Sequence, residues 1–581
     1  MSARELITEH LDLWTRAVTK KSTSGRGSNG KIELTGVKKL RELILGMAVQ
    51  GKLTTREASD EPASDLLQRV SARQTQLYTQ GKIKRRKKLP SVSVEEQYFH
   101  LPENWEWTRL GALFDSIMSG GTPSKQNSRF WNGDIPWASV KDLGKTKHLD
   151  ETQDYITKEG LKAGSKLADT GDVLICTRMG LGKIAICSKP IAINQDLKAV
   201  KVSPEVSLDY FFLAYTTLDI TGTGTTVAGI TQDKLLSYVI GLPPIEEQHR
   251  IVQKVNELMA LCDRLEQQTS DQLEAHETLV DTLLGTLTQS ENATELADNW
   301  ARLAAHFDTL FTTEQSIDKL KQTILQLAVM GRLVEQDAGD ELATNLLTQI
   351  HTRKMALAGE KRIKRPRPLT QLDETQHSYP APANWVWASF EDIADEISTG
   401  PFGSMIHKHD YVENGTPLVN PSHMVSGGIK EDSSVSVTPA KAEELSSYKL
   451  AKGDIVMARR GEVGRCAIVT DRESGWLCGT GSFVLRFHSA INRRFILLLF
   501  STDTVRDYLT GNSVGTTMTN LNHGILKKMP VALPSTEEQY RIVQKVDELM
   551  ALCDQLKERL NRASETRCQL AAAVVEGAVK R

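Results

Sequence analysis

The sequence predicts an α+β protein in which two globular domains are separated by long paired helices, arranged by internal duplication. One helical segment occurs twice, shorter matches precede each copy, and a divergent segment lies between the matches. The helical segment, EEQHRIVQKVNELMALCDRL, begins at Glu246 and returns from Glu537 as EEQYRIVQKVDELMALCDQL, with seventeen of twenty residues identical. Such a repeat predicts two copies of one unit whose helices share a structural or partner-binding role.

The repeated segment carries apolar residues at helical spacing. In the first copy the positions are separated by 4, 3, 4 and 3 residues, which places them on one seam of a helix that packs against another helix. The seam residues are Ile251, Val255, Leu258, Cys262 and Leu265 in the first copy, and Ile542, Val546, Leu549, Cys553, Leu556 and Leu560 in the second. The seams predict long paired helices, and the predicted architecture joins them as an antiparallel coiled coil.

Other elements of the chain also recur. The stretch KLRELILGMAVQGKL from Lys39 matches KLKQTILQLAVMGRL from Lys319, and PENWEW from Pro102 matches PANWVW from Pro382. The first of these predicts a helix from about Gly36 to a glycine cap at Gly51. We also match a stripe near the N-terminus with one between the repeats: Ile7, Leu11, Trp14 and Val18 with Leu296, Trp300, Leu303 and Phe307. This match predicts circular pseudo-twofold symmetry, with the chain ends close together.

Length and these matches together predict the domain organisation. A chain of 581 residues is too long for one core. The predicted parts are an N-terminal helical region and basic linker (1–100), a first globular domain (101–244), a central helical region (245–335), a linker with a basic run (336–380), a second globular domain (381–534) and a C-terminal helix (535–581).

Composition excludes several classes of protein. The 71 Lys and Arg residues balance 73 Asp and Glu residues, so any surface for a polyanion must be local. Seven cysteines form no zinc-like pattern, and their odd number suits a reducing cytoplasm. The start, MSARELITEH, lacks an apolar signal core, and no apolar run is long enough to span a membrane. We therefore expect a soluble cytoplasmic protein.

The two globular segments share a framework but differ in surface residues. Both contain short Val/Ile-rich runs between glycine-rich turns, such as DVLICTR from Asp172 and DIVMARR from Asp454, which predict a mixed α+β fold. A basic run precedes each segment, KIKRRKK at 82–88 and KRIKRPR at 361–367. Clustered cations bind phosphates, although such a run is also typical of a solvated loop. The pattern indicates one fold that carries two specificities.

With these motifs, the chain resembles the specificity subunit of a type I restriction-modification system over essentially its whole length. The resemblance rests on the two EEQxRIVxKVxELMxLCDxL helices, the LPPIEEQ and LPSTEEQ entries to them, and the NWEW and NWVW openings. It implies that each globular domain is a target recognition domain reading half of a split sequence in double-stranded DNA. The repeated helices would set the spacer and bind two modification subunits, with restriction subunits joining through the complex.

Candidate DNA contacts are long or polar side chains in the basic runs and at the turns of the globular domains. They are Lys84, Arg85, Arg86, Ser124, Lys125, Arg178, Lys183, Thr225, Thr226, Lys364, Arg365, Arg459, Arg460, Arg465, Thr516, Thr517, Asn520, Asn522 and His523. Taken alone, any one of those in the globular domains fits an ordinary surface or turn residue better than a base contact, whereas for the basic runs the two interpretations are balanced. Candidate partner contacts lie on the helix faces outside the seams, which are alike in the two copies: Gln248, Arg250, Lys254, Glu257, Gln539, Arg541, Lys545 and Glu548.

Enzymatic motifs are incomplete. GLGKI from Gly180 has Thr177 where a phosphate loop needs its first glycine, and Ile184 where it needs Ser or Thr. Asn420-Pro421 is followed by Ser422, so it does not match the Asn-Pro-Pro-aromatic motif of amino-methyltransferases. No metal or nucleophile cluster is evident, and AdoMet, ATP and Mg²⁺ are expected in partner subunits. Two alternatives stay open: a self-contained DNA enzyme and a coiled-coil scaffold without DNA affinity.

Overall fold

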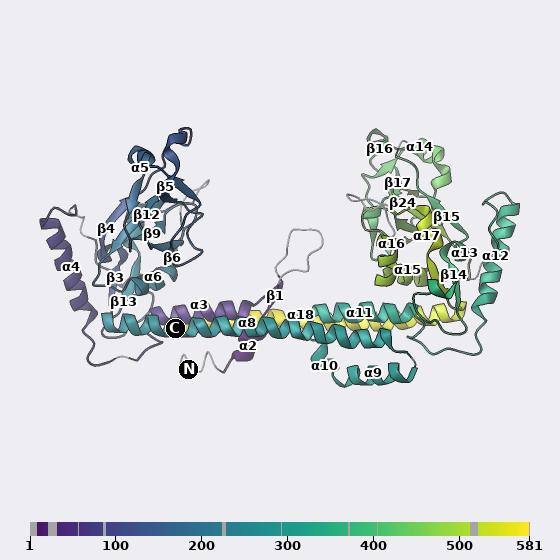
Figure 1. The fold of residues 1–581 in the computed structure, drawn as a ribbon, viewed down its shortest axis with the longest axis horizontal. Coiled ribbons are helices and arrows are strands. Elements are labelled where there is room, and N and C mark those ends of the chain that lie inside the picture. The colour runs from purple at the N-terminus through teal and green to yellow at the C-terminus, as the bar shows by residue number, and fades with distance from the viewer. Residues whose placement is uncertain are drawn as a thin grey trace. The chain divides into compact units, whose positions relative to one another are not determined.

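The computed structural model describes residues 9–20, 32–55, 57–84, 89–222, 228–291, 293–369, 372–403, 405–511 and 521–579. They form two compact units. Unit 1 comprises Met1–Gln272 with Ala563–Arg581, and unit 2 comprises Leu273–Arg562. Each unit therefore contains one globular domain together with parts of both long helices (Figure 1).

Among the described residues, unit 1 contains two sheets and two separate strand pairs, one of which is β1-β2. One sheet has the order β4-β12-β9-β10-β6, the second has the order β7-β5-β11-β8, and β3 pairs with β13. Buried aliphatic side chains on β9 and β10 join the core. The strands are β1 Thr19–Lys20, β2 Ile32–Glu33, β3 Glu106–Arg109, β4 Phe114–Ser119, β5 Trp131–Ala138, β6 His148–Leu149, β7 Asp154–Ile156, β8 Lys166–Ala168, β9 Val173–Cys176, β10 Ile184–Cys187, β11 Ile191–Ile193, β12 Leu197–Val202 and β13 Val239–Leu242.

Unit 2 repeats the central part of this topology and adds the strand pair β18-β19. The sheet β15-β24-β21-β22 has the connectivity of β4-β12-β9-β10, the sheet β16-β20-β17-β23 contains the matching parallel pair, and β14 pairs with β25 as β3 does with β13. The strands are β14 Val386–Ser389, β15 Glu396–Thr399, β16 Tyr411–Val412, β17 Thr416–Val419, β18 Met424–Val425, β19 Gly428–Ile429, β20 Ser436–Val437, β21 Ile455–Ala458, β22 Cys466–Ile468, β23 Leu477–Cys478, β24 Ser482–Arg486 and β25 Pro530–Leu533. The predicted α+β class is thus confirmed.

Helices cover the sheets and form the base of each unit. Those of unit 1 are α2 Leu11–Arg16, α3 Thr35–Val49, α4 Ala63–Thr79, α5 Lys158–Gly164, α6 Leu208–Thr216 and α7 Gln232–Ser237. Those of unit 2 are α9 Ala293–Ala305, α10 Phe307–Leu310, α11 Glu314–Val329, α12 Ala343–Gly359, α13 Phe390–Ile393, α14 Pro439–Glu444, α15 Arg493–Ser501, α16 Asp503–Gly511 and α17 His523–Lys528. The long helices α8 Ile245–Gln289 and α18 Thr536–Val579 contribute to both units. No helix within the described ranges combines the length and hydropathy needed to cross a membrane.

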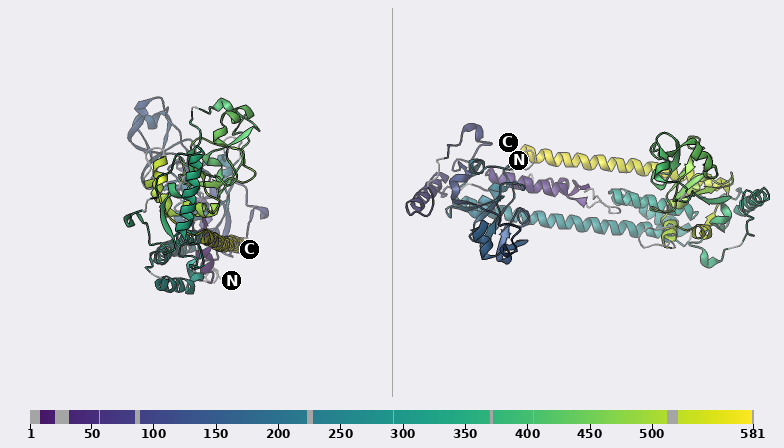
Figure 2. Two further views of the ribbon diagram at one scale, coloured as in Figure 1. Left: turned by 90° about the vertical axis from the view of Figure 1, so that its right-hand side faces the viewer. Right: turned by 90° about the horizontal axis from the view of Figure 1, so that it is seen from above.

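The predicted seams are buried in part: six of their eleven residues are buried, and the other five are partly buried, namely Leu258, Leu265, Leu549, Leu556 and Leu560. Ile251 and Cys262 are buried in unit 1, and Ile542 and Cys553 are buried in unit 2. In unit 1 the neighbour is α3, which runs between the first part of α8 and the last part of α18 (Figure 2). In unit 2, α11 contacts both long helices, because it forms ion pairs with each of them.

Helices α3 and α11 each end at a glycine in the left-handed conformation. Gly51 follows α3 with φ +68°, and Gly331 follows α11 with φ +71°. A Cβ atom at Gly51 would lie 2.6 Å from the ring of Pro102, and one at Gly331 would lie 2.5 Å from the ring of Pro382. The glycine therefore both caps the helix and lets the next segment pack closely. The predicted cap at Gly51 is confirmed.

The predicted match between the two tryptophan stripes is wrong. Trp14 is fully buried against α3, whereas Trp300 is 40% exposed, and Ile7 lies outside the described residues. The structure instead aligns α2 with α10: His10 and His306 precede helices that begin Leu11-Asp12 and Phe307-Asp308. The apolar residues of the two stripes have the same spacing, but spacing alone does not define which face a helix buries.

Candidate nucleic-acid interface

The turns after β9 and β21 present cations on matching backbones. The amide of Cys176 donates to the Lys183 carbonyl in unit 1, and the amide of Ala458 donates to the Arg465 carbonyl in unit 2. Arg178 is 54% exposed, with its guanidinium 3.7 Å from the Asp196 carboxylate. Arg460, at the equivalent place, is exposed. These two arginines are thus accessible to solvent at matching places of the two units.

Two other predicted contacts also support the fold. Lys183 donates from Nζ to the carbonyl of Val140 at 3.5 Å, and Arg465 donates from Nη1 to the carbonyl of Pro421 at 3.4 Å. Both bonds are long, and both reach the loop that follows the matching strands β5 and β17. Lys183 and Arg465, which are equivalent in the two units, therefore each contact a loop of their own domain. The Lys183 side chain is also exposed to solvent.

Three predicted contacts in unit 2 are held by their own domain. Arg459 lies over the ring of Phe483 at 5.5 Å, and burial lowers the pKa of its guanidinium. Asn522 caps α17 by accepting from the Gly524 and Ile525 amides. His523 is half-buried against the carbonyl of Ile397, and burial lowers its pKa. Arg459 and His523 are thus less available to DNA than the sequence suggests, whereas Asn522 stays exposed.

The loop after β4 holds Ser124 and Lys125, both of which are exposed. Its backbone is fixed, because the Trp131 indole donates to the Ser124 carbonyl at 3.1 Å. In unit 2 the loop after β15 exposes Phe402, which is 69% accessible. Sequence reasoning missed Phe402 because it sought only polar contacts.

The basic runs follow α4 and α12, which pack on their own domains. Arg73 of α4 donates to the buried Asp115 carboxylate at 3.0 Å. Lys354 of α12 donates to the Glu391 carbonyl at 2.5 Å, and burial lowers its pKa. Beyond the helices, Lys84, Lys364 and Arg365 are exposed, which suits a solvated loop as well as a phosphate contact. Seven further candidates lie outside the described residues: Arg85, Arg86, Thr225, Thr226, Thr516, Thr517 and Asn520.

The predicted partner faces need correction at four residues. Gln248 and Gln539 are fully buried, and each accepts from a backbone amide of its own domain, Ser207 and Asn492 respectively. Arg250 and Arg541 are held in internal ion pairs. These residues recur because both units use them to fix the start of the long helix. Lys254 with Glu257, and Lys545 with Glu548, form i,i+3 ion pairs in which both side chains keep solvent access.

The structure brings together two motifs that the sequence showed only separately. The indole of Trp105, from the NWEW opening, donates to the buried Glu247 carboxylate at 3.0 Å. In unit 2, Gln336 and Asn384 donate to the equivalent Glu538 at 2.6 and 3.4 Å, and burial raises the pKa of Glu538. The opening of each globular domain is therefore fastened to the helix that follows it.

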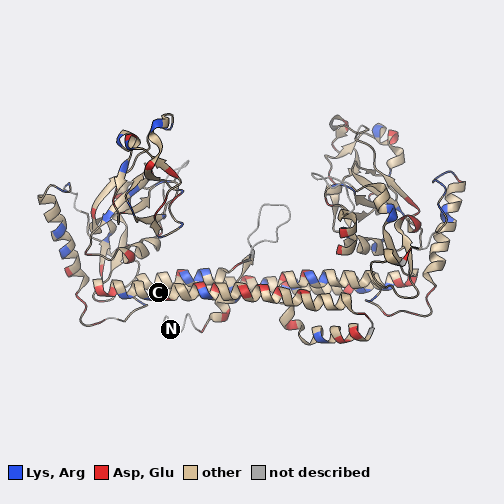
Figure 3. Ribbon diagram, in the orientation of Figure 1, with Lys and Arg blue, Asp and Glu red and all other residues tan. Residues whose placement is uncertain are grey.

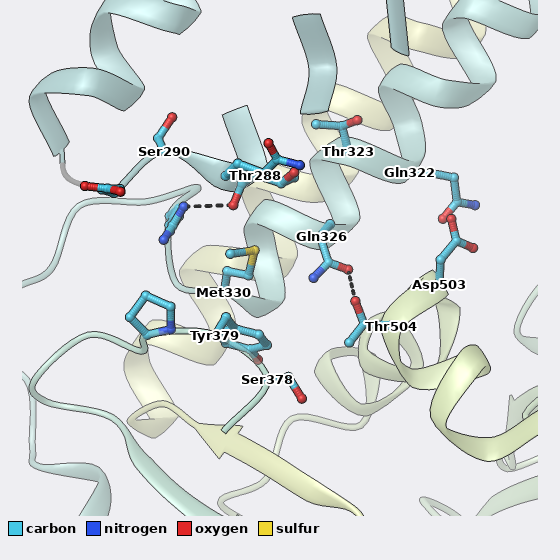
Figure 4. A pocket seen from close by; sticks show the side chains of 14 residues that line it. Thr288, Ser290, Gln322, Thr323, Gln326, Met330, Ser378, Tyr379, Asp503 and Thr504 are labelled. Carbon is cyan, nitrogen blue, oxygen red and sulfur yellow. Dashed lines mark hydrogen bonds between the residues drawn. The ribbon is translucent and has the colours of Figure 1, made fainter. Parts of the chain in front are cut away.

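Acidic and basic residues are interspersed along the long helices (Figure 3). Within the described ranges, no group of His, Cys, Asp and Glu residues is arranged to hold a metal ion. Unit 2 has a cavity of about 650 Å³ between the end of α8, α11, the segment 378–380 and α16. Arg332 donates to the Thr288 carbonyl and Thr504 donates to Gln326 across its wall (Figure 4). None of the predicted DNA or partner contacts lines it.

Comparison with known proteins identifies the family. The type I restriction modification DNA specificity domain matches residues 102–275 and 384–564. The chain is 35% identical to the specificity subunits of the type I restriction enzymes EcoEI and EcoAI of Escherichia coli, with 100% of each chain covered. A solved structure, the HsdS subunit from Thermoanaerobacter tengcongensis, aligns with 83% of this chain and 98% of its own at 17% identity and a TM-score of 0.39. The chain therefore belongs to the family of type I restriction-modification DNA specificity subunits.

Proposed function

We propose that each globular domain reads one half of a bipartite site in double-stranded DNA, while α8 and α18 set the spacer between the halves. The observation that carries this proposal is the presence of one framework with two different surfaces. Arg250 with Asp60 and Arg541 with Asp340 make the same bidentate contact in the two units. The loop residues differ, since the exposed Phe402 stands where the other unit has the partly buried Thr122. One fold with two loop sets suits two different half-sites.

We infer circular pseudo-twofold symmetry from the way each unit is completed. Unit 1 combines α3 with the start of α8 and the end of α18, whereas unit 2 combines α11 with the start of α18 and the end of α8. Lys52 donates to the Ala578 carbonyl at the end of α18, and Arg332 donates to the Thr288 carbonyl at the end of α8. The same cation position thus meets the carbonyl end of a long helix in both units. This correspondence supports an antiparallel arrangement of the long helices.

Two modification subunits are the proposed partners, one for each unit. Each unit exposes one leucine from each long helix: Leu261 and Leu570 in unit 1, Leu552 and Leu279 in unit 2. Leu261 corresponds to Leu552 in the repeat, and Leu279 corresponds to Leu570. A single exposed leucine is ordinary on a protein surface, but its recurrence at matching positions of both repeats favours a protein contact, and equal surfaces suit equal partners. Restriction subunits would join through the assembled complex in the cytoplasm of the host.

Catalysis is assigned to the partners. AdoMet for methyl transfer, and ATP with Mg²⁺ for the endonuclease, would be bound by the modification and restriction subunits. The contribution of this chain is to bind DNA and to place the modification subunits over the two half-sites. Its residues need to recognise base edges and phosphates, for which arginine, lysine and amide side chains suffice.

Methylome sequencing of a host that carries this chain with its modification partner tests the proposal. We expect methylated adenines in a split motif with a spacer of fixed length. An unsplit motif would contradict the assignment of one half-site to each domain. Methylation by the purified chain with AdoMet alone would instead favour a self-contained enzyme. Absence of DNA affinity in the assembled complex would favour a scaffold.

A further inference from the structure

The turn between β9 and β10 holds a methionine in an unfavourable backbone conformation. Met179 has φ +60°, in the left-handed region that residues with a Cβ atom rarely adopt. The turn is tied down on both sides, because the Met179 amide donates to the Ala228 carbonyl at 3.3 Å and the Ile230 amide donates to the Thr177 carbonyl at 2.9 Å. The backbone thus fixes the direction in which the Met179 side chain leaves the domain.

The fold itself does not need a methionine there. The matching turn of unit 2 carries Gly461, with φ +76°. The two turns agree in their hydrogen bonds as well, since the Lys183 amide donates to the Gly180 carbonyl and the Arg465 amide donates to the Glu462 carbonyl. Glycine adopts this conformation without steric cost. The side chain of Met179 is therefore retained for a reason other than the shape of the turn.

Packing inside the domain is not that reason. Met179 is 70% exposed, so its apolar side chain gains little from burial within unit 1. Its neighbours on the turn are the half-exposed Arg178 and the exposed Lys183. An apolar side chain flanked by two cations fits a polyanion that also offers apolar surface, which describes the grooves of DNA. Strain stored at an exposed turn is typical of a functional residue.

We propose that Met179 is a specificity-determining residue of unit 1, which makes an apolar contact with a base of its half-site while Arg178 and Lys183 approach the phosphates or base edges. The contacted surface is either the methyl group of thymine in the major groove or the face of a base at a partly unstacked step. This inference rests on the proposed function, because it assumes that unit 1 reads one half of a split sequence.

The test uses the full chain with its modification subunits and compares methylomes of wild type, Met179→Gly and Met179→Leu. Met179→Gly removes the side chain but suits the positive φ, so it should fold at least as well as wild type, and its melting temperature should not fall. Met179→Leu keeps an apolar chain of similar size. Met355→Ala is the matched control, because it removes a 38% exposed methionine from the helix α12.

For Met179→Gly we expect relaxed recognition at one position of one half-site, with about tenfold less discrimination there, as a single base contact provides. The other half-site and the spacer should stay unchanged. Met179→Leu should retain most of the discrimination, and Met355→Ala should methylate the wild-type motif. Replacing thymine by uracil in a duplex that carries the motif distinguishes the two surfaces: weaker wild-type binding supports the methyl contact, and unchanged binding supports the stacked base.

Two results would overturn the inference: an unchanged motif and methylation level in Met179→Gly, or equal changes in both half-sites, which would indicate a role in assembly. Failure of the proposed function is distinguishable, because wild type itself would then give no split motif.

Discussion

Arg541 donates from both terminal nitrogens of its guanidinium to the carboxylate of Asp340, at 2.9 and 2.6 Å. The two residues are 201 positions apart. Arg250 makes the same contact with Asp60 in unit 1. In both units the pair joins the first turns of a long helix to the segment that precedes α4 or α12. The Asp side chains are almost inaccessible, at 2% for Asp60 and 6% for Asp340, so each pair acts as an internal fastening.

Arg541→Ala should destabilise unit 2 by about 2 kcal/mol, because it leaves a nearly buried carboxylate without its partner. Arg494→Ala is the control. Its guanidinium also binds a carboxylate at two points, on Asp547, but both side chains are exposed, so the destabilisation should be less than about 1 kcal/mol. Urea unfolding measures the difference. Equal destabilisation in the two variants would show that burial of the carboxylate does not matter.

The same pair predicts a dependence on pH. The hydrogen bonds from Arg541 hold the pKa of Asp340 below its ordinary value of 3.8. A carboxyl whose folded-state pKa is lowered contributes stability above the unfolded pKa and loses it as the pH falls through the folded pKa. The stability difference between wild type and Asp340→Asn should therefore be constant from pH 7 to about pH 5 and shrink below about pH 4. A difference that persists unchanged at pH 3 would contradict the assignment.

Substitutions at seam and surface residues of α8 should affect different properties: the first should lower stability, and the second should weaken binding of the modification subunits. Ile251→Ala empties a fully buried position and should cost about 3 kcal/mol. Leu261→Ser, at a 49% exposed position, should change stability by less than about 0.5 kcal/mol. The double variant Leu261→Ser and Leu552→Ser should nevertheless fail to retain modification subunits, as measured by native mass spectrometry. A double variant that still binds two of them would remove these leucines from the interface.

The exposed cations after α12 should bind DNA phosphates and so contribute to the salt dependence of DNA binding. Replacing Lys364 and Arg365 by Ala should lower the slope of log K against log salt by roughly 0.9 for each phosphate that is no longer neutralised, and should weaken binding to all sequences alike. Arg559→Ala, an exposed cation on α18, is the control and should leave the slope unchanged. A double variant with the wild-type slope would assign the run to a solvated linker.

The spacer prediction concerns both long helices, since each one passes from one unit to the other. Inserting four residues after Gln272 and four after Arg562 should lengthen each helix by about 6 Å, close to two base pairs. Both half-site sequences should persist while the gap in the methylated motif grows. Two-residue insertions would turn the packed faces by more than half a turn and should abolish methylation. A four-residue variant with the original gap would contradict the proposal that α8 and α18 set the spacer.

Periodicity made the seams predictable, because Ile251 and Ile542 lie on an apolar stripe that any helix must bury. The contact of Trp105 with Glu247 was not predictable, although both motifs were visible, since nothing in the sequence says that they meet. Gln248 was misassigned to a partner surface because identity between repeats arises from internal packing as readily as from binding. The conformation of Met179 depends on backbone torsion, and only its alignment with Gly461 could have suggested it.

The last part of α18 has a consequence for the order in which the protein is made. Ala571 is buried in the core of unit 1, and Gln50 donates to the carbonyl of Val579, 529 positions later. The first globular domain therefore leaves the ribosome long before the end of α18 is available to pack against α3. During that interval the apolar face of α3 has no cover from α18, and contacts of such separation form slowly. Unit 1 should thus complete its core only after the last residues of α18 have been synthesised.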